Sequence, residues 1–109
     1  ELDSSNGRFR VELSPPAGGW PLNRQFVLPF RLKAAKPGLP VPADLKIDVD
    51  ASMPAHRHGS NLTPAIRQVG EGDYRITGLL LHMKGEWKIR LTLTAGTTVD
   101  EVVIPIQLD

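Results

Sequence analysis

Two short segments hold all of the imidazole and thioether side chains in this sequence. The first runs Met53-Pro54-Ala55-His56-Arg57-His58-Gly59, and the second is the pair His82-Met83. Imidazole nitrogen suits copper and zinc, and the methionine thioether favours Cu(I). The sequence therefore predicts a copper site, for Cu(I) or Cu(II), with these candidate ligands: His56, His58, His82, Met53 and Met83.

The spacing within the first segment supports a shared ion. In an extended chain, residues two apart point to the same side, so His56 and His58 can bind one metal. Gly59 lets the backbone turn tightly beside them. The chain has no cysteine, which excludes disulfides and the Cys-containing sites that structural zinc normally uses.

Each candidate ligand also has a structural alternative. His56 and His58 could hydrogen-bond to loop backbone groups without any metal. His82 follows three leucines and could be a half-buried histidine bonded to the first loop. Methionines are common core fillers, and this applies to Met53 and Met83.

The composition excludes several classes of function. The 109 residues carry 13 basic and 12 acidic side chains, for a net charge of +1, with no run of like charges. Nucleic acid is therefore not an expected partner. No apolar stretch approaches the ~18 residues that would span a bilayer. We expect a single domain over residues 1–109, with a disordered N-terminal extension over residues 1–6.

Apolar residues alternate with polar ones along most of the chain, which is the pattern of half-buried strands. The alternating stretches are 9–13, 25–33, 44–50, 65–69, 74–80, 87–94 and 99–108. About seven such strands between turns predict an all-β, immunoglobulin-like β-sandwich of antiparallel strands. Pro29 and Pro105 indicate an edge strand or a bulge, and Gly78 a bulge or a close approach of backbone. Tyr74 and Trp87 fall on the core face.

The order of these strands places the two metal-binding segments together. If successive strands run up and down the sandwich, Met53 to Gly59 and His82-Met83 lie at the same end, with the loop that contains Trp20. The Pro-rich connection 36–42 and the turn at Gly96 lie at the other end. Asp48 and Asp50 could bind a hard cation, but their alternation with Ile47 and Val49 favours a solvated strand face.

No catalytic arrangement stands out, and we expect the protein not to be an enzyme. Ser52 and Ser60 lie near histidines, but no acidic residue is placed to orient one, and no oxyanion-hole motif is present. A Gly-rich phosphate loop is also lacking.

At these residues the sequence resembles the YtkA-like domain family and the related FixH-type domains of bacterial membrane and periplasmic proteins. The resemblance covers roughly residues 45–95. It rests on Met53, Pro54, His56, His58, Gly59, Pro64, Gly72, Tyr74, Met83, Gly85 and Trp87. Lys84 stands where the family often has proline, which affects no candidate ligand. The resemblance implies an extracytoplasmic immunoglobulin-like domain, commonly anchored by an N-terminal lipid or helix and associated with copper handling or cytochrome oxidase maturation.

Two functions follow as hypotheses. The first is a small extracytoplasmic copper carrier or chaperone, periplasmic or on the cell surface, tethered to or released from a membrane anchor. The second is a protein-interaction module of a membrane or respiratory assembly, whose His/Met loop is structural and binds no metal. Edge strands, which can accept a partner's strand, favour the second.

Overall fold

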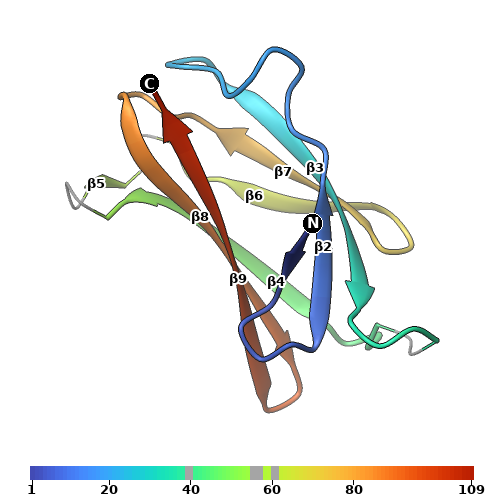
Figure 1. Ribbon diagram of the computed structural model, residues 1–109. Helices are drawn as coiled ribbons and strands as arrows, with labels where there is room; N and C mark the ends of the chain where they lie inside the picture. Colours follow the sequence, from blue (N-terminus) through green and yellow to red (C-terminus); the bar gives the residue numbers. More distant parts are fainter. Residues whose placement is uncertain (39–40, 55–57, 60–61) are drawn as a thin grey trace.

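The protein is a sandwich of two antiparallel sheets (Figure 1). The computed structural model describes residues 1–38, 41–54, 58–59 and 62–109, with His58 and Gly59 described through their backbone alone. The described residues form nine strands and no helix. The predicted all-β, immunoglobulin-like sandwich is confirmed.

The strand order within each sheet explains which segments become neighbours. The five-stranded sheet runs β1 (Leu2–Asp3), β2 (Phe9–Leu13), β3 (Phe26–Ala34), β7 (Asp73–Leu79) and β6 (Ala65–Gly70). The four-stranded sheet runs β5 (His58–Gly59), β4 (Lys46–Met53), β8 (Gly85–Ala95) and β9 (Thr98–Leu108). Strands β6 and β9 therefore lie at sheet edges, among the described residues, where their backbones can pair with another chain.

The core lies between the sheets and follows from the alternation of apolar residues. On β8, Trp87, Ile89 and Leu91 are fully buried, whereas Arg90 between them is exposed. Leu28 on β3 meets this core from the opposite sheet. Burial of a large apolar side chain contributes about 1.5–3 kcal/mol. The predicted core positions of Tyr74 and Trp87 are confirmed.

Proline and glycine within the strands mark local irregularities. Pro105 lies on the edge strand β9, as expected. Pro29 lies on β3, which has neighbours on both sides, so the predicted edge position is wrong, although the register shifts between Phe26 and Leu28 nearby. Gly78 has a φ of +71°, and a β-carbon there would lie 3.2 Å from the Thr63 carbonyl oxygen. The predicted close approach at Gly78 is confirmed.

A buried carboxylate fastens the N-terminal segment to β9. Asp100 is 2% exposed, and Ser4 Oγ donates a hydrogen bond of 2.6 Å to it. The backbone N–H groups of Asn6 and Glu101 donate two more, at 2.9 and 2.8 Å. Burial raises the pKa of Asp100, but these hydrogen bonds outweigh it and hold the pKa below its ordinary value. Residues 1–6, expected from the sequence to be a disordered extension, contain β1 and this buried serine.

Candidate metal centre at one end of the sandwich

The described parts of the two segments that carry the candidate ligands lie at one end of the sandwich, which we call the His/Met end. It consists of the β4–β5 hairpin and residues 80–84, which lead into β8. Met53 pairs with His58 in the hairpin, and Ser52 pairs with Lys88 near the start of β8. In Figure 1, β5 and the beginning of β8 lie at the same end, beside the C-terminus. The placement expected from strand order holds for Met53, for the backbone of His58 and for residues 82–83.

The first loop also reaches the His/Met end. The backbone N–H of Asn23 donates a hydrogen bond of 2.7 Å to the Leu81 carbonyl, next to His82. Trp20 is half-buried and packs against Phe26, with ring centroids 6.1 Å apart. Trp20 thus covers the core beneath this loop.

His82 has a nitrogen without a partner among the described residues. Its Nδ1 atom is buried and makes no hydrogen bond within that part of the chain. The ring lies edge-on to Trp87, with centroids 5.4 Å apart and planes at 77°. A buried polar atom left unsatisfied costs about 1–3 kcal/mol. The contact with Trp87 therefore orients the imidazole, and no described residue occupies the hydrogen-bonding position of its Nδ1 atom.

Met83 is held by its backbone and free at its side chain. Trp87 Nε1 donates a hydrogen bond of 2.9 Å to the Met83 carbonyl oxygen. Met83 as a whole is 39% exposed. The residue therefore lies at the surface, on a backbone that a buried tryptophan fixes.

Met53 is packed differently. It is the last residue of β4 and is 0% exposed. Its Cε atom lies 2.7 Å from where a β-carbon on Gly85 would stand, so the missing side chain of Gly85 makes room for it. Met53 thus fills the core, which is the alternative that the sequence left open for it.

The remaining candidates are only partly described. His56 lies outside the described residues, and for His58 only the backbone position on β5 is known. Within the described ranges, no three His, Cys, Asp or Glu side chains gather as metal ligands would. Asp48 and Asp50 are exposed along β4, as expected for a solvated strand face.

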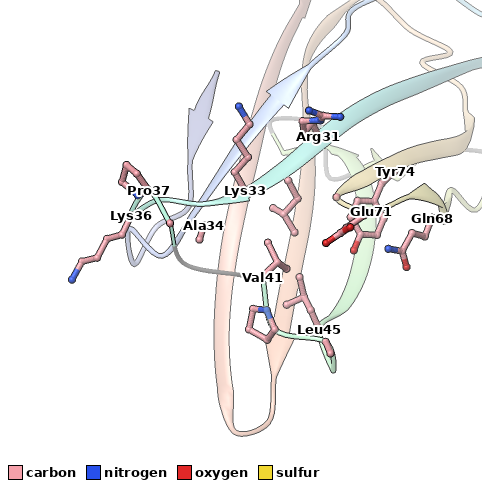
Figure 2. A pocket seen from close by; sticks show the side chains of 15 residues that line it. Arg31, Lys33, Ala34, Lys36, Pro37, Val41, Leu45, Gln68, Glu71 and Tyr74 are labelled. Carbon is pink, nitrogen blue, oxygen red and sulfur yellow. The ribbon is translucent and has the colours of Figure 1, made fainter.

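A cavity of about 660 Å³ opens at the other end of the sandwich. It lies between β3, the β6–β7 turn and residues 36–38 and 41–45, and Figure 2 shows Gln68, Glu71 and Tyr74 on one side, opposite Lys36 and Pro37. Burial raises the pKa of Tyr74, so its hydroxyl stays protonated at neutral pH. The lining contains no histidine or methionine, which separates this cavity from the predicted metal ligands.

Sequence reasoning missed three features of the surface and core. Gly85 was recognised only as one of the residues that match the family pattern, and not as the residue that leaves space for the Met53 side chain. Asp100 has the same parity as Val102 and Ile104, so the alternation along β9 could have placed this charged residue on the buried face. Arg67 and Arg75 lie directly opposite each other on β6 and β7. The sequence could have shown this pairing. Arg67 and Arg75 each lie four residues from Glu71, the middle of the turn, and residues equidistant from a turn lie opposite each other in a hairpin.

Comparison with known proteins identifies one relationship. A family model described as YtkA-like matches residues 5–92. The matched range covers most of the chain and extends well before the residues that carry the resemblance in the sequence. Neither curated proteins nor solved structures give a match.

Proposed function

The chain belongs to the YtkA-like family, and on that premise we propose that it is a non-catalytic copper-binding domain, a carrier or chaperone, whose site lies at the His/Met end. The observation that carries the proposal is the buried Nδ1 of His82, which has no partner among the described residues and lies at the end of the sandwich where the hairpin bearing His58 also lies.

The chemistry of the donors favours copper. Copper is the most strongly bound first-row divalent ion at nitrogen sites, and thioether sulfur adds affinity for Cu(I). The proposed ligands are His56, His58, His82 and the exposed thioether of Met83. The sequence also predicts Met53 as a ligand. Its side chain packs in the core, so it is not among the ligands proposed here, and its role stays a prediction. A bound ion would accept electron density from imidazole and thioether, without any reaction of a substrate.

The structure also supports a division of roles within this end. Trp87 fixes the backbone of Met83 through its indole N–H and holds the His82 ring in place by an edge contact. Such supporting residues commonly change metal affinity by about 10- to 100-fold when they are altered. Trp87 is therefore assigned as a positioning residue, not a ligand.

The proposal includes a periplasmic or cell-surface location, with the domain tethered to or released from a membrane anchor. Its support is the family resemblance. Among the described residues, the chain contains no helix long and apolar enough to cross a membrane.

The direct test is calorimetric titration of the protein with Cu(II), and with Cu(I) under a reductant. We expect a dissociation constant tighter than about 10 µM. We also expect the melting temperature to rise with copper, because a ligand bound only by the native state stabilises it. The variant His56→Ala/His58→Ala/His82→Ala should lose both effects.

Lys84→Ala is the matched control, because Lys84 is exposed and lies in the same segment as His82 and Met83. It should bind copper as the unaltered protein does. Absence of binding, or binding that survives the triple histidine variant, would refute the copper proposal. The second candidate, an interaction module, would then stand, supported by the edge strand β6, where Val69 is 49% exposed.

A further inference from the structure

The outer face of the five-stranded sheet carries many charged side chains, and most of its cations are already neutralised. The ion pairs join Arg10 to Asp3 at 3.0 Å, Arg31 to Asp73 at 2.9 Å and Lys33 to Glu12 at 2.6 Å. All three are exposed, so they set the charge of this surface and add little to stability.

Arg67 and Arg75 are the exception. They lie directly opposite each other in the β6–β7 register, and both are exposed. On the other side of Arg75 the paired residue is Pro29, which carries no charge. Within the described chain, neither guanidinium has a carboxylate in ion-pair range. Like charges directly opposite across two strands repel, so this pair lowers the stability of the sheet unless an anion joins it.

The surface beside this pair is hollowed and partly apolar. A depression of about 520 Å³ is lined by Arg75, Pro29, Val69 and Asp73, among others. Val69 is 49% exposed and lies on β6, the edge strand of the sheet. Arg75 thus lines a partly apolar hollow, and Arg67 lies on the edge strand β6 beside it. We call Arg67, Arg75, Pro29 and Val69 the arginine patch.

We propose that the arginine patch binds an acidic, extended segment of a protein partner. Two carboxylates of the segment would each accept hydrogen bonds from one guanidinium, which matches carboxylates in a planar, two-pronged geometry. The segment's backbone would run along the edge of β6, as in strand addition. This proposal is independent of copper binding at the His/Met end.

The small number of unpaired basic side chains favours a short acidic peptide over a polyanionic surface as the ligand. Recognition of an anionic membrane typically needs about four to eight basic residues, each worth about 1 kcal/mol. Among the described residues of this face, Arg67 and Arg75 alone lack a carboxylate partner, and the cations Arg31 and Lys33 are already paired with Asp73 and Glu12. A short acidic segment can place its carboxylates at the arginines alone.

A second copy of this chain fits less well than a different protein. Exposed carboxylates are available on the outer face of the opposite sheet, at Asp48 and Asp50. A copy that used them would leave its own arginine patch free, and the contact would repeat head to tail into an open filament. Acidic residues on another protein would give a closed complex.

The test uses the full chain and a fluorescein-labelled peptide, Glu-Val-Glu-Val-Glu-Val, in a fluorescence polarisation titration at low salt. The control peptide is Gln-Val-Gln-Val-Gln-Val. We expect the acidic peptide alone to bind, with affinity falling as salt rises. Arg67→Gln/Arg75→Gln should weaken binding about five- to twentyfold, the loss expected for two exposed ion pairs.

The variant Arg8→Gln/Arg24→Gln makes the same change in net charge at two other exposed arginines and should bind normally. Arg67→Glu/Arg75→Glu should instead bind Lys-Val-Lys-Val-Lys-Val. Equal effects of the two Gln variants would overturn the proposal, as would no binding of the acidic peptide. So would binding to vesicles containing 30% phosphatidylserine without binding to the peptide, or a sedimentation coefficient that grows with protein concentration.

Discussion

Met53 occupies the space in which a side chain on Gly85 would stand, because its Cε atom lies 2.7 Å from the position of a β-carbon there. One residue ends β4 and the other begins β8, so this contact joins the two segments that carry the candidate ligands. Gly85 also has a φ of +131°, which L-residues with a side chain rarely adopt.

Gly85→Ala should therefore destabilise the protein by about 1–3 kcal/mol, measured by urea denaturation. Most of this cost is backbone strain, because the end of a methionine side chain can move away from a new methyl group. Met53→Ala in the same chain should consequently fail to restore stability. Full restoration would show that the steric contact, and not the backbone, sets the cost.

The two methionines should respond differently to the same change. Met83→Leu should weaken Cu(I) binding by at least about tenfold, because an exposed thioether is lost. Met53→Leu should cost less than about 1.5 kcal/mol in stability, since it nearly conserves volume in the core, and should leave Cu(I) affinity close to normal. Competition titration against a Cu(I) chelator measures the Cu(I) affinity of both variants. A larger loss with Met53→Leu would assign the buried sulfur as a ligand.

Trp87→Phe removes the indole N–H that holds the Met83 carbonyl oxygen. We expect a stability loss of about 1–3 kcal/mol and a roughly tenfold weaker affinity for copper, because residues 82–83 lose their support. Tyr74→Phe is the matched control, since it alters a buried aromatic residue at the opposite end. If both variants weakened copper binding equally, Trp87 would have no positioning role.

Removal of the Asp100 carboxylate should be costly. Asp100→Ala loses three hydrogen bonds at a buried site, and we expect about 3 kcal/mol of destabilisation by urea denaturation. Ser4→Ala should cost about as much, because Ser4 Oγ also accepts hydrogen bonds from the backbone N–H groups of Arg8 and Phe9, at 3.1 and 2.9 Å. Equal stability of the Asp100→Ala variant and the unaltered protein would mean that water replaces the carboxylate without loss.

The same carboxylate should make stability depend on acid. The folded-state pKa of Asp100 lies below its ordinary value of 3.8. Its contribution is therefore complete above that ordinary value and is lost as pH falls through the folded-state pKa. The pKa values of Glu12 and Asp73 are lowered in the same sense by Lys33 and Arg31. Asp100→Asn should flatten the acid limb of a plot of unfolding free energy against pH without removing it.

The strands that could be predicted from the sequence are those in which apolar and polar residues alternate over a long stretch. The long alternating stretches that became β3, β8 and β9 each bury one complete face, so their pattern is strong. Strands β1 and β5 have two residues each, too few for any alternation to show. Pro29 was wrongly predicted to mark an edge strand. Strand β2 ends opposite Phe30. The next contact with β3 is a hydrogen bond from the Ser14 N–H to the Pro29 carbonyl oxygen, which needs no N–H on the proline. An interior strand can therefore tolerate this proline.

The candidate site was predictable in its location and less so in its packing. Strand order was enough to bring residues 82–83 to the hairpin that contains Met53. The burial of Met53 follows from the alternation that places Ile47, Val49 and Ala51 toward the core, once β4 is extended past Asp50. The buried nitrogen of His82, which has no partner in the described ranges, depends on neighbours distant in sequence, so no local pattern could show it.

The hydrogen bond between Ser4 and Asp100 joins residues 96 positions apart in the chain. By contrast, the β8–β9 hairpin closes between Ala95 and Thr98. Because a longer loop costs more entropy to close, we expect the hairpin to form early in folding and the N-terminal segment to dock last. Asp100→Ala should then accelerate unfolding and leave the folding rate nearly unchanged. The Asp100 carboxylate would therefore determine how long the native state persists before it unfolds, and not how fast the chain folds.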